Sequence, residues 1–150
     1  YVQLHGAESP EVCRELRAAL PGAVIIKAVR VDVRRPADDA ERGAMAAQLV
    51  GQVAPYVSVV DHLLFDVQVD GAPGGTGVSF DWSLLSAARS QLEACGARAF
   101  FLAGGLTPDN VAEAVETVDP YAVDVASGVE RLPRRKDFEK MKRFIRSAKG

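Results

Sequence analysis

The chain has 150 residues, of which 48% are hydrophobic and 25% charged, enough to build one globular domain over residues 1–150. Its net charge of −2 comes from mixed acidic and basic residues, which argues against nucleic acid and anionic membrane surfaces as partners. The two cysteines, Cys13 and Cys95, belong to no Cys/His cluster, so neither a zinc site nor a disulfide framework is expected. A reducing cytoplasm is therefore the expected compartment.

Five short apolar segments are predicted to be strands, at residues 2–5, 24–28, 63–66, 99–103 and 122–125. The segments between them have helical period, which predicts parallel strands joined by crossover helices. None of the apolar runs reaches the roughly 20 residues that a membrane helix needs.

Helix boundaries are marked by Ser9-Pro10 and Thr107-Pro108 as starts and by Gly96 as a stop. Apolar residues at helical spacing predict three stripes that pack in the core. These stripes are Val12, Leu16 and Leu20; Val111, Val115 and Val118; and Phe138, Met141, Ile145 and Ala148.

Glycines gather after the middle and late strands, at 74–77, 104–105 and 128. An open nucleotide-binding sheet would usually have its glycine-rich turn after the first strand. Parallel barrels have eight strands, and their phosphate sites form after the seventh and eighth. We therefore expect an α/β fold of the (β/α)8 TIM-barrel type, present here as five βα units of an incomplete barrel.

Several strings resemble, in order, strands four to eight of phosphoribosylanthranilate isomerase and the loops that follow them. They span nearly the whole chain: VQLHG (2–6), IKAV (26–29), LLFD (63–66), GGTGVSFDWSL (74–84), FLAGGLTPDNVAEAV (101–115), VDVASGVE (123–130) and KDFEKMKRFIRSAK (136–149). The resemblance, together with a start at Tyr1, leads us to expect that the N-terminal strands are missing.

The resemblance implies an isomerase of tryptophan biosynthesis that uses no cofactor. It would convert N-(5-phosphoribosyl)anthranilate to 1-(2-carboxyphenylamino)-1-deoxyribulose 5-phosphate by an Amadori rearrangement, which needs an acid and a base. The family's base is a cysteine on the first strand, in the missing segment, so the 150 residues alone are expected to be inactive. Cys13 and Cys95 are expected to be packing residues. Exposed sheet edges predict association with the missing segment or with a second copy.

The general acid of the family corresponds to Asp66, at the end of a predicted strand, where barrel enzymes place catalytic groups. An apolar surround would favour the protonated carboxyl group that an acid needs. A loop-capping role is the alternative. Asp124 is expected to contact the sugar or anthranilate part of the substrate, and His5 to touch the substrate from the catalytic face. A structural role remains open for both residues.

A phosphate cradle is expected from Gly104 and Gly105 after one strand and from Ser127 and Gly128 after the next, with a short helix start beyond Gly128. The loop residues Gly74, Gly75, Thr76 and Gly77 resemble the family's mobile loop over the site. Asp81 is expected to cap a helix and Trp82 to pack beneath the loop. The basic residues Arg131, Arg134, Arg135 and Lys136 suggest either a solvated approach to a helix or attraction of a phosphorylated substrate.

Two other functions stay open. The chain as it stands could be a catalytically inactive phosphate-binding barrel fragment that lacks its base. It could also be a related phosphoribosyl-substrate isomerase of histidine biosynthesis, although the GGTGVSFDWSL string and the lack of an internal repeat argue against that relative.

Overall fold

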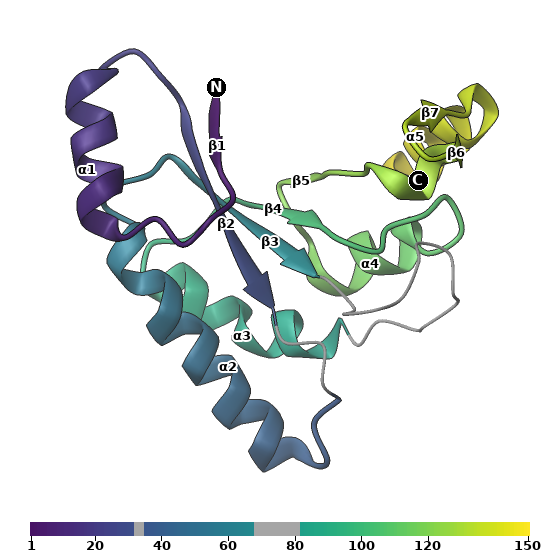
Figure 1. Cartoon of the computed structure of the whole chain (residues 1–150). Coiled ribbons are helices and arrows are strands. Elements are labelled where there is room, and N and C mark those ends of the chain that lie inside the picture. Colours follow the sequence, from purple (N-terminus) through teal and green to yellow (C-terminus); the bar gives the residue numbers. More distant parts are fainter. Residues whose placement is uncertain (32–34, 68–81) are drawn as a thin grey trace.

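A parallel five-stranded sheet is the centre of the computed structural model, which describes residues 1–31, 35–67 and 82–150. The strands follow one another in the order β1-β2-β3-β4-β5 (Figure 1). Their bounds are β1 Val2–Leu4, β2 Ile25–Val31, β3 His62–Val67, β4 Phe100–Ala103 and β5 Ala122–Val123. The predicted parallel α/β architecture is confirmed, whereas the assignment of these five strands to an incomplete (β/α)8 barrel stays a prediction.

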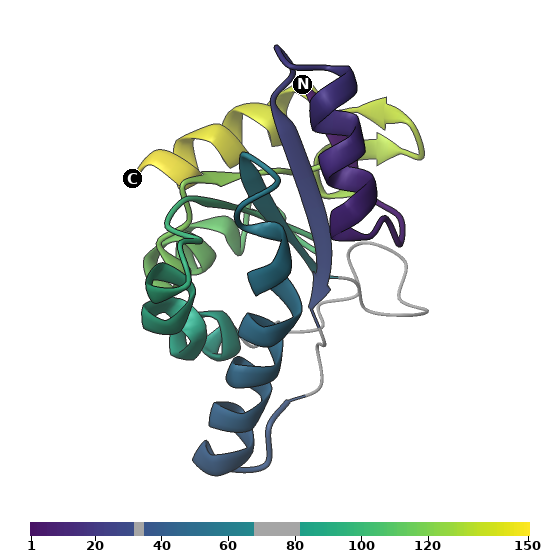
Figure 2. The ribbon, with the colours of Figure 1, turned by 90° about the vertical axis from the view of Figure 1, so that its left-hand side faces the viewer.

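Helices connect successive strands, as expected for right-handed parallel crossovers. They are α1 Pro10–Ala19, α2 Asp39–Val53 with the 3₁₀ turn η1 Ala54–Tyr56, α3 Ser83–Ala94, α4 Val111–Val118 and the last helix α5 Phe138–Lys149. Between β5 and α5 lie a 3₁₀ turn, η2 Ser127–Val129, and a hairpin of β6 Glu130–Leu132 and β7 Arg135–Lys136. Figure 2 shows α2 and α3 together on one side of the sheet.

The two faces of the sheet have different surroundings. Alternate strand residues such as Ile25, Leu63 and Phe65 are buried in one large apolar core together with residues of all five helices. The residues between them form a smaller cluster, Ile26, Ala28, Leu64 and Ala103, with Phe101 beside it. We call these sides the helix-covered face and the inner face.

The predicted helix boundaries are confirmed at two of three places. Ser9 caps α1 with Pro10 in the first turn, and Gly96 follows α3 with φ of 101°. Thr107-Pro108 begins a turn instead of the helix itself, because α4 starts at Val111 after the cap residue Asn110.

One predicted apolar stripe is confirmed, and the other two are wrong except for Leu16 and Ala148, which pack against the core. Val111 and Val118 of α4 are buried, and Val115 packs against the same core. On α1, by contrast, Val12 is 45% exposed, and Leu20 is exposed as well, because this helix packs through Cys13 and Leu16.

On α5 three of the four residues of the predicted stripe are exposed. Phe138 is 68% exposed and Met141 and Ile145 are also exposed, since the helix packs through Phe144 and Ala148. Its main contacts are with α4 and η2, and Lys140 Nζ also donates to Glu130 O of β6 at 2.8 Å.

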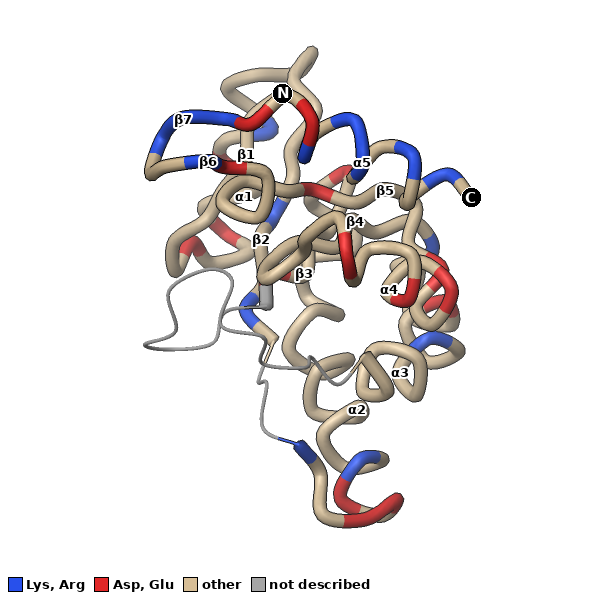
Figure 3. The backbone as a smooth tube through the Cα atoms, turned by 90° about the vertical axis from the view of Figure 1, so that its right-hand side faces the viewer, with Lys and Arg blue, Asp and Glu red and all other residues tan. Residues whose placement is uncertain are grey.

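The basic cluster lies on the exposed β6–β7 hairpin, which leads directly into α5, so the predicted solvated approach to a helix is confirmed. Arg131 lies in β6, Arg134 turns the chain with φ of 65°, and Arg135 and Lys136 form β7. The prediction that a helix starts beyond Gly128 is wrong, because the β6–β7 hairpin follows directly after the single 3₁₀ turn η2. Figure 3 shows the hairpin and α5 as neighbouring blue segments at one end of the molecule.

Candidate active site

The carboxyl ends of the five parallel strands bring most of the predicted site residues to one edge of the sheet. Asp66 of β3 pairs in register with Arg30 of β2 on one side and with Ala103 of β4 on the other. The backbone N–H of Asp124 donates to Leu102 O at 2.8 Å, which continues the ladder past β5. Because parallel α/β folds bind ligands at this edge, the location supports a functional site.

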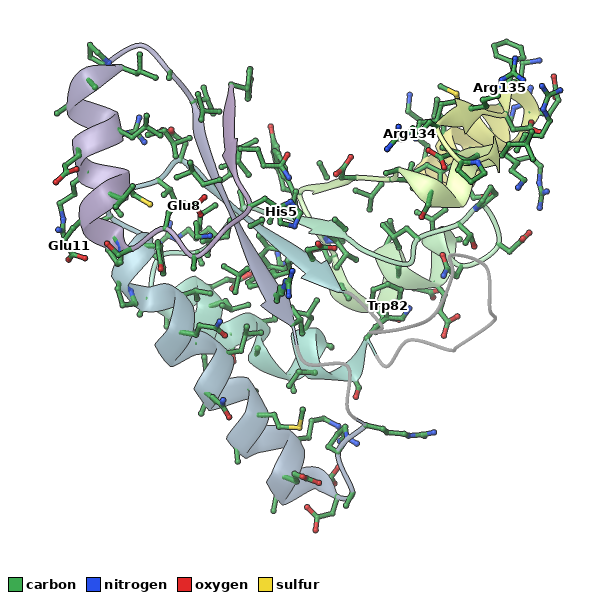
Figure 4. All side chains as sticks on the ribbon, in the orientation of Figure 1. His5, Glu8, Glu11, Trp82, Arg134 and Arg135 are labelled. Atoms are coloured by element: carbon green, nitrogen blue, oxygen red, sulfur yellow. The ribbon has the colours of Figure 1, made fainter. Side chains whose placement is uncertain are left out.

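His5 and Asp66 are in direct contact. His5 Nε2 lies 2.9 Å from Asp66 Oδ2, so a side chain that follows β1 reaches one on β3, across β2. Asp66 is only 5% exposed, whereas the His5 ring is open to solvent. Figure 4 shows His5 at the end of β1, pointing toward the neighbouring strands.

The ring of His5 has a second neighbour that fits one tautomer. Gln3 Nε2 lies 3.4 Å from His5 Nδ1, an amide donor facing a ring nitrogen. With the ring proton on Nε2, His5 accepts from Gln3 and donates to Asp66. This arrangement ties a buried carboxyl group to an exposed imidazole, which suits a group that exchanges protons with a substrate.

The four residues of the predicted phosphate cradle lie in two turns that touch. Gly104 and Gly105 follow β4 with φ of 85° and 62°. A Cβ on Gly128 would lie 1.8 Å from Leu106 O, so the turn after β5 rests directly on the backbone of the turn after β4. Ser127 is the exposed first residue of η2, next to Gly128.

Asn110 fixes the shape of the turn after β4, a role that the sequence prediction missed. Its Oδ1 accepts from Thr107 N at 2.7 Å, and its Nδ2 donates to Gly105 O at 3.1 Å. The Asn110 side chain therefore forms hydrogen bonds with one backbone donor and one backbone acceptor that lie outside the β-ladder. The sequence signal for this role was an Asn three residues after Thr107, in the segment that follows the glycine pair.

Asp124 lies one residue beyond β5, which is shorter than the predicted strand. Val123 and Val125 on either side pack against the helix-covered core, so the alternation of an extended chain turns the exposed Asp124 side chain the other way. Arg30, which sequence reasoning also missed, is exposed and belongs to the inner-face positions of β2.

Both cysteines lie away from this edge. Cys13 is fully buried in the helix-covered core, and burial raises the pKa of its thiol. Cys95 is half-buried, and its Sγ donates to Leu92 O at 3.1 Å. These surroundings agree with the predicted packing role of both side chains.

The remaining predicted residues divide into described and undescribed ones. Trp82 is buried in the helix-covered core at the start of α3. Gly74, Gly75, Thr76, Gly77 and Asp81 lie outside the described residues. Over the described part of the chain, no group of three or more His, Cys, Asp or Glu side chains is arranged to hold a metal ion. No described helix has the length and apolar character to span a bilayer.

Comparisons with known proteins agree on one family. Residues 1–147 match the family described as "N-(5'phosphoribosyl)anthranilate (PRA) isomerase". The chain is 41% identical over 144 residues to N-(5'-phosphoribosyl)anthranilate isomerase of Acaryochloris marina and 44% identical over 149 residues to that of Geobacter sulfurreducens. These alignments cover 96% and 99% of this chain but 58% and 61% of the relatives, so the chain spans about three fifths of their length.

Solved structures give the same result. Phosphoribosyl anthranilate isomerase from Thermotoga maritima matches with a TM-score of 0.72 and 36% identity, over 99% of this chain and 61% of that one. A phosphoribosyl anthranilate isomerase in complex with reduced 1-(o-carboxyphenylamino)-1-deoxyribulose 5-phosphate matches with a TM-score of 0.69 and 34% identity, over 99% and 59%. The chain belongs to the N-(5'-phosphoribosyl)anthranilate isomerase family.

Proposed function

We propose that the protein takes part in tryptophan biosynthesis by isomerising N-(5-phosphoribosyl)anthranilate, with Asp66 as the general acid. The observation that carries this proposal is the buried Asp66 carboxyl group at the carboxyl edge of the sheet, held by His5 at 2.9 Å. Family membership supplies the substrate class. The similar isomerase solved in complex with reduced 1-(o-carboxyphenylamino)-1-deoxyribulose 5-phosphate supports a phosphorylated ligand for this chain.

The acid step follows from the chemistry of the substrate. Asp66 gives its proton to the furanose ring oxygen while the bond between that oxygen and C1 breaks. The anilino nitrogen supplies the electron pair that forms a C=N bond to C1, and the ring oxygen leaves as a hydroxyl group. The His5 N–H then stabilises the carboxylate that remains on Asp66.

The second step removes a proton from C2, and the resulting enol rearranges to the ketone. The family resemblance assigns the removal of that proton to a cysteine base outside these 150 residues, and this assignment stays a prediction. The assignment of β1 to β5 to the fourth to eighth strands of a barrel stays a prediction as well.

The substrate's other groups have candidate partners at the same edge. We place the phosphate against the backbone of the two touching turns, at Gly104, Gly105, Ser127 and Gly128, where small residues allow close approach of N–H groups. Asp124, exposed beside β4, is placed against the sugar hydroxyl groups or the anthranilate. Arg30 adds a cation on the same side as Asp66.

The test is turnover of N-(5-phosphoribosyl)anthranilate, followed by anthranilate fluorescence in the full product of the gene and in the 150-residue chain. Asp66→Asn should lower kcat by roughly 10²–10⁴-fold, the usual share of general acid catalysis. Asp61→Asn is the matched control, because Asp61 precedes β3 at the opposite end of the same strand. It should leave kcat unchanged.

The outcomes separate the alternatives. A folded full-length protein without turnover rejects the proposal and makes the histidine-pathway substrate the next one to test. Turnover by the 150 residues alone shows that the predicted upstream base is wrong. Equal kcat in Asp66→Asn and the parent removes Asp66 from the acid role.

A further inference from the structure

A buried lysine lies on the side of the sheet opposite to the His5–Asp66 pair. Lys27 of β2 is 4% exposed and belongs to the helix-covered face, where its neighbours two residues away are apolar. A cation in such a place is costly unless its donors are satisfied. Lys27 Nζ has three acceptors: Gly6 O at 2.8 Å, Glu8 Oε2 at 3.0 Å and Ala28 O at 2.9 Å.

Two of these acceptors belong to the short segment that joins β1 to α1. Glu8 closes this segment on itself, since both of its carboxylate oxygens accept from Gly6 N, at 3.1 and 3.0 Å. The turn is tight enough that a Cβ on Gly6 would lie 2.8 Å from Glu8 Oε1. Tyr56 of η1 adds a hydrogen bond from its hydroxyl to Glu8 O at 3.0 Å.

The Glu8 carboxylate is held in its charged form by these contacts. Hydrogen bonds from the backbone, first its own N–H, and from Lys27 lower the pKa of Glu8 against the opposing effect of burial. Figure 4 shows Glu8 on one side of this segment, between α1 and the sheet, and His5 on the other side. Lys27, Glu8 and Gly6 therefore form one hydrogen-bonded unit.

This unit fixes the backbone directly after His5. His5 lies past the last residue of β1, so the β1–β2 ladder does not hold it, and its ring is exposed. Its ring must nevertheless stay within 2.9 Å of Asp66 Oδ2. The bonds at Gly6 remove freedom from the adjacent residue, as catalytic geometry requires of its supporting groups.

We propose that Lys27 and Glu8 are positioning residues for the His5–Asp66 pair: the buried ion pair sets the Gly6 turn, and the turn aims the imidazole. The effect on catalysis that we expect rests on the proposed function, whereas the effect on the orientation of the His5 ring does not. Lys27 lies on the helix-covered face, opposite to the His5–Asp66 pair, so it acts on that pair through the Gly6 turn.

The experiment compares Lys27→Met, Glu8→Gln and the double variant with Arg17→Gln, the matched control. Arg17 also joins α1 to the sheet through a carboxylate, donating to Asp61 Oδ2 at 2.7 Å, but at the amino end of the strands. In the full gene product, the positioning role predicts a roughly tenfold to hundredfold fall in kcat for each Lys27 or Glu8 variant, with KM little changed. Arg17→Gln should lower stability and leave kcat unchanged.

The double variant separates positioning from simple stabilisation. It leaves no unpaired buried charge, so its stability should recover relative to Lys27→Met. If the pair served stability alone, kcat would recover with it. If the pair positions His5, kcat stays low, because Gly6 still lacks its carboxylate partner.

A spectroscopic measurement tests the geometry without turnover. The imidazole signal that is lost in the spectrum of His5→Gln is the signal of His5. In the parent the ¹⁵N shift of His5 Nε2 should be that of a protonated, hydrogen-bonded nitrogen. In Lys27→Met and Glu8→Gln it should move toward a mixture of tautomers, and in Arg17→Gln it should not.

The results of the two readouts are distinguishable. An unchanged His5 signal in folded Lys27→Met overturns the positioning proposal, whatever the turnover. A His5 signal that changes in the variants, together with a parent protein that lacks turnover, supports the positioning proposal and rejects the proposed function. Should Lys27→Met fail to fold, Glu8→Gln carries the same test, because Glu8 retains 27% side-chain exposure and its replacement leaves water able to reach the site.

Discussion

Individual residues of this chain were predictable to different degrees. The position of Asp66 and His5 at the carboxyl edge of the sheet could be predicted, because each ends a predicted strand. Their direct contact could not, since it depends on the register of three strands. Lys27 was read as part of a strand, and nothing in the local sequence indicates that Glu8, nineteen positions earlier, neutralises it.

Asp61 gives a pH-dependent prediction at this scale. Its pKa is lowered from the ordinary 3.8, first by the hydrogen bond from Arg17 and then by that from Ile25 N. A carboxyl group with a lowered folded pKa stabilises the protein above its unfolded pKa and loses that contribution as pH falls through the folded value. Asp61→Asn should therefore cost about 1 kcal/mol at pH 7.

The measurement is urea unfolding of parent and variant, followed by circular dichroism between neutral pH and pH below 3.8. The difference in unfolding free energy should shrink as the pH falls through that range. A difference that is constant with pH would show that the carboxylate charge contributes nothing.

Elements were predicted better than the faces they bury. All five strands were located, because β-rich apolar runs between turn residues have few other interpretations. The stripes on α1 and α5 were mostly wrong, since periodicity shows that apolar residues share a side of the helix but not which side meets the sheet. The two turns proposed to bind phosphate were located from their glycines, while their contact with each other could be found only from the fold.

That contact gives a prediction at the element scale. Gly128→Ala should destabilise the protein by about 1–3 kcal/mol, the cost of an overpacked site, because its Cβ would overlap Leu106 O. Gly51→Ala in α2 is the control with the opposite sign, since nothing lies within 4 Å of that Cβ. Gly51→Ala should raise the free energy of unfolding by about 0.5–1 kcal/mol. Thermal unfolding of both variants checks the pair, and equal effects would contradict it.

At the scale of the whole molecule, the sheet ends in two strands that each have one described neighbour, β1 and β5. Exposed apolar side chains add to these edges, notably Phe138 and Ile145 on α5. Unpaired edges and exposed apolar surface favour association. We therefore predict that the 150-residue chain associates with itself or with a supplied upstream segment.

Sedimentation velocity over a range of concentrations tests this prediction. The apparent mass should rise with concentration, and Phe138→Lys combined with Ile145→Lys should reduce the rise. A monomer at all concentrations that unfolds cooperatively at an ordinary temperature would falsify the expectation.

Trp82 has one more consequence. It is the single tryptophan of the chain, and it is buried at the start of α3. All indole emission therefore comes from one place in the molecule, without any added label. Anthranilate absorbs light in the range where indole emits, so a bound anthranilate ring will accept that energy, and the quenching will report occupancy of the protein before any bond is broken.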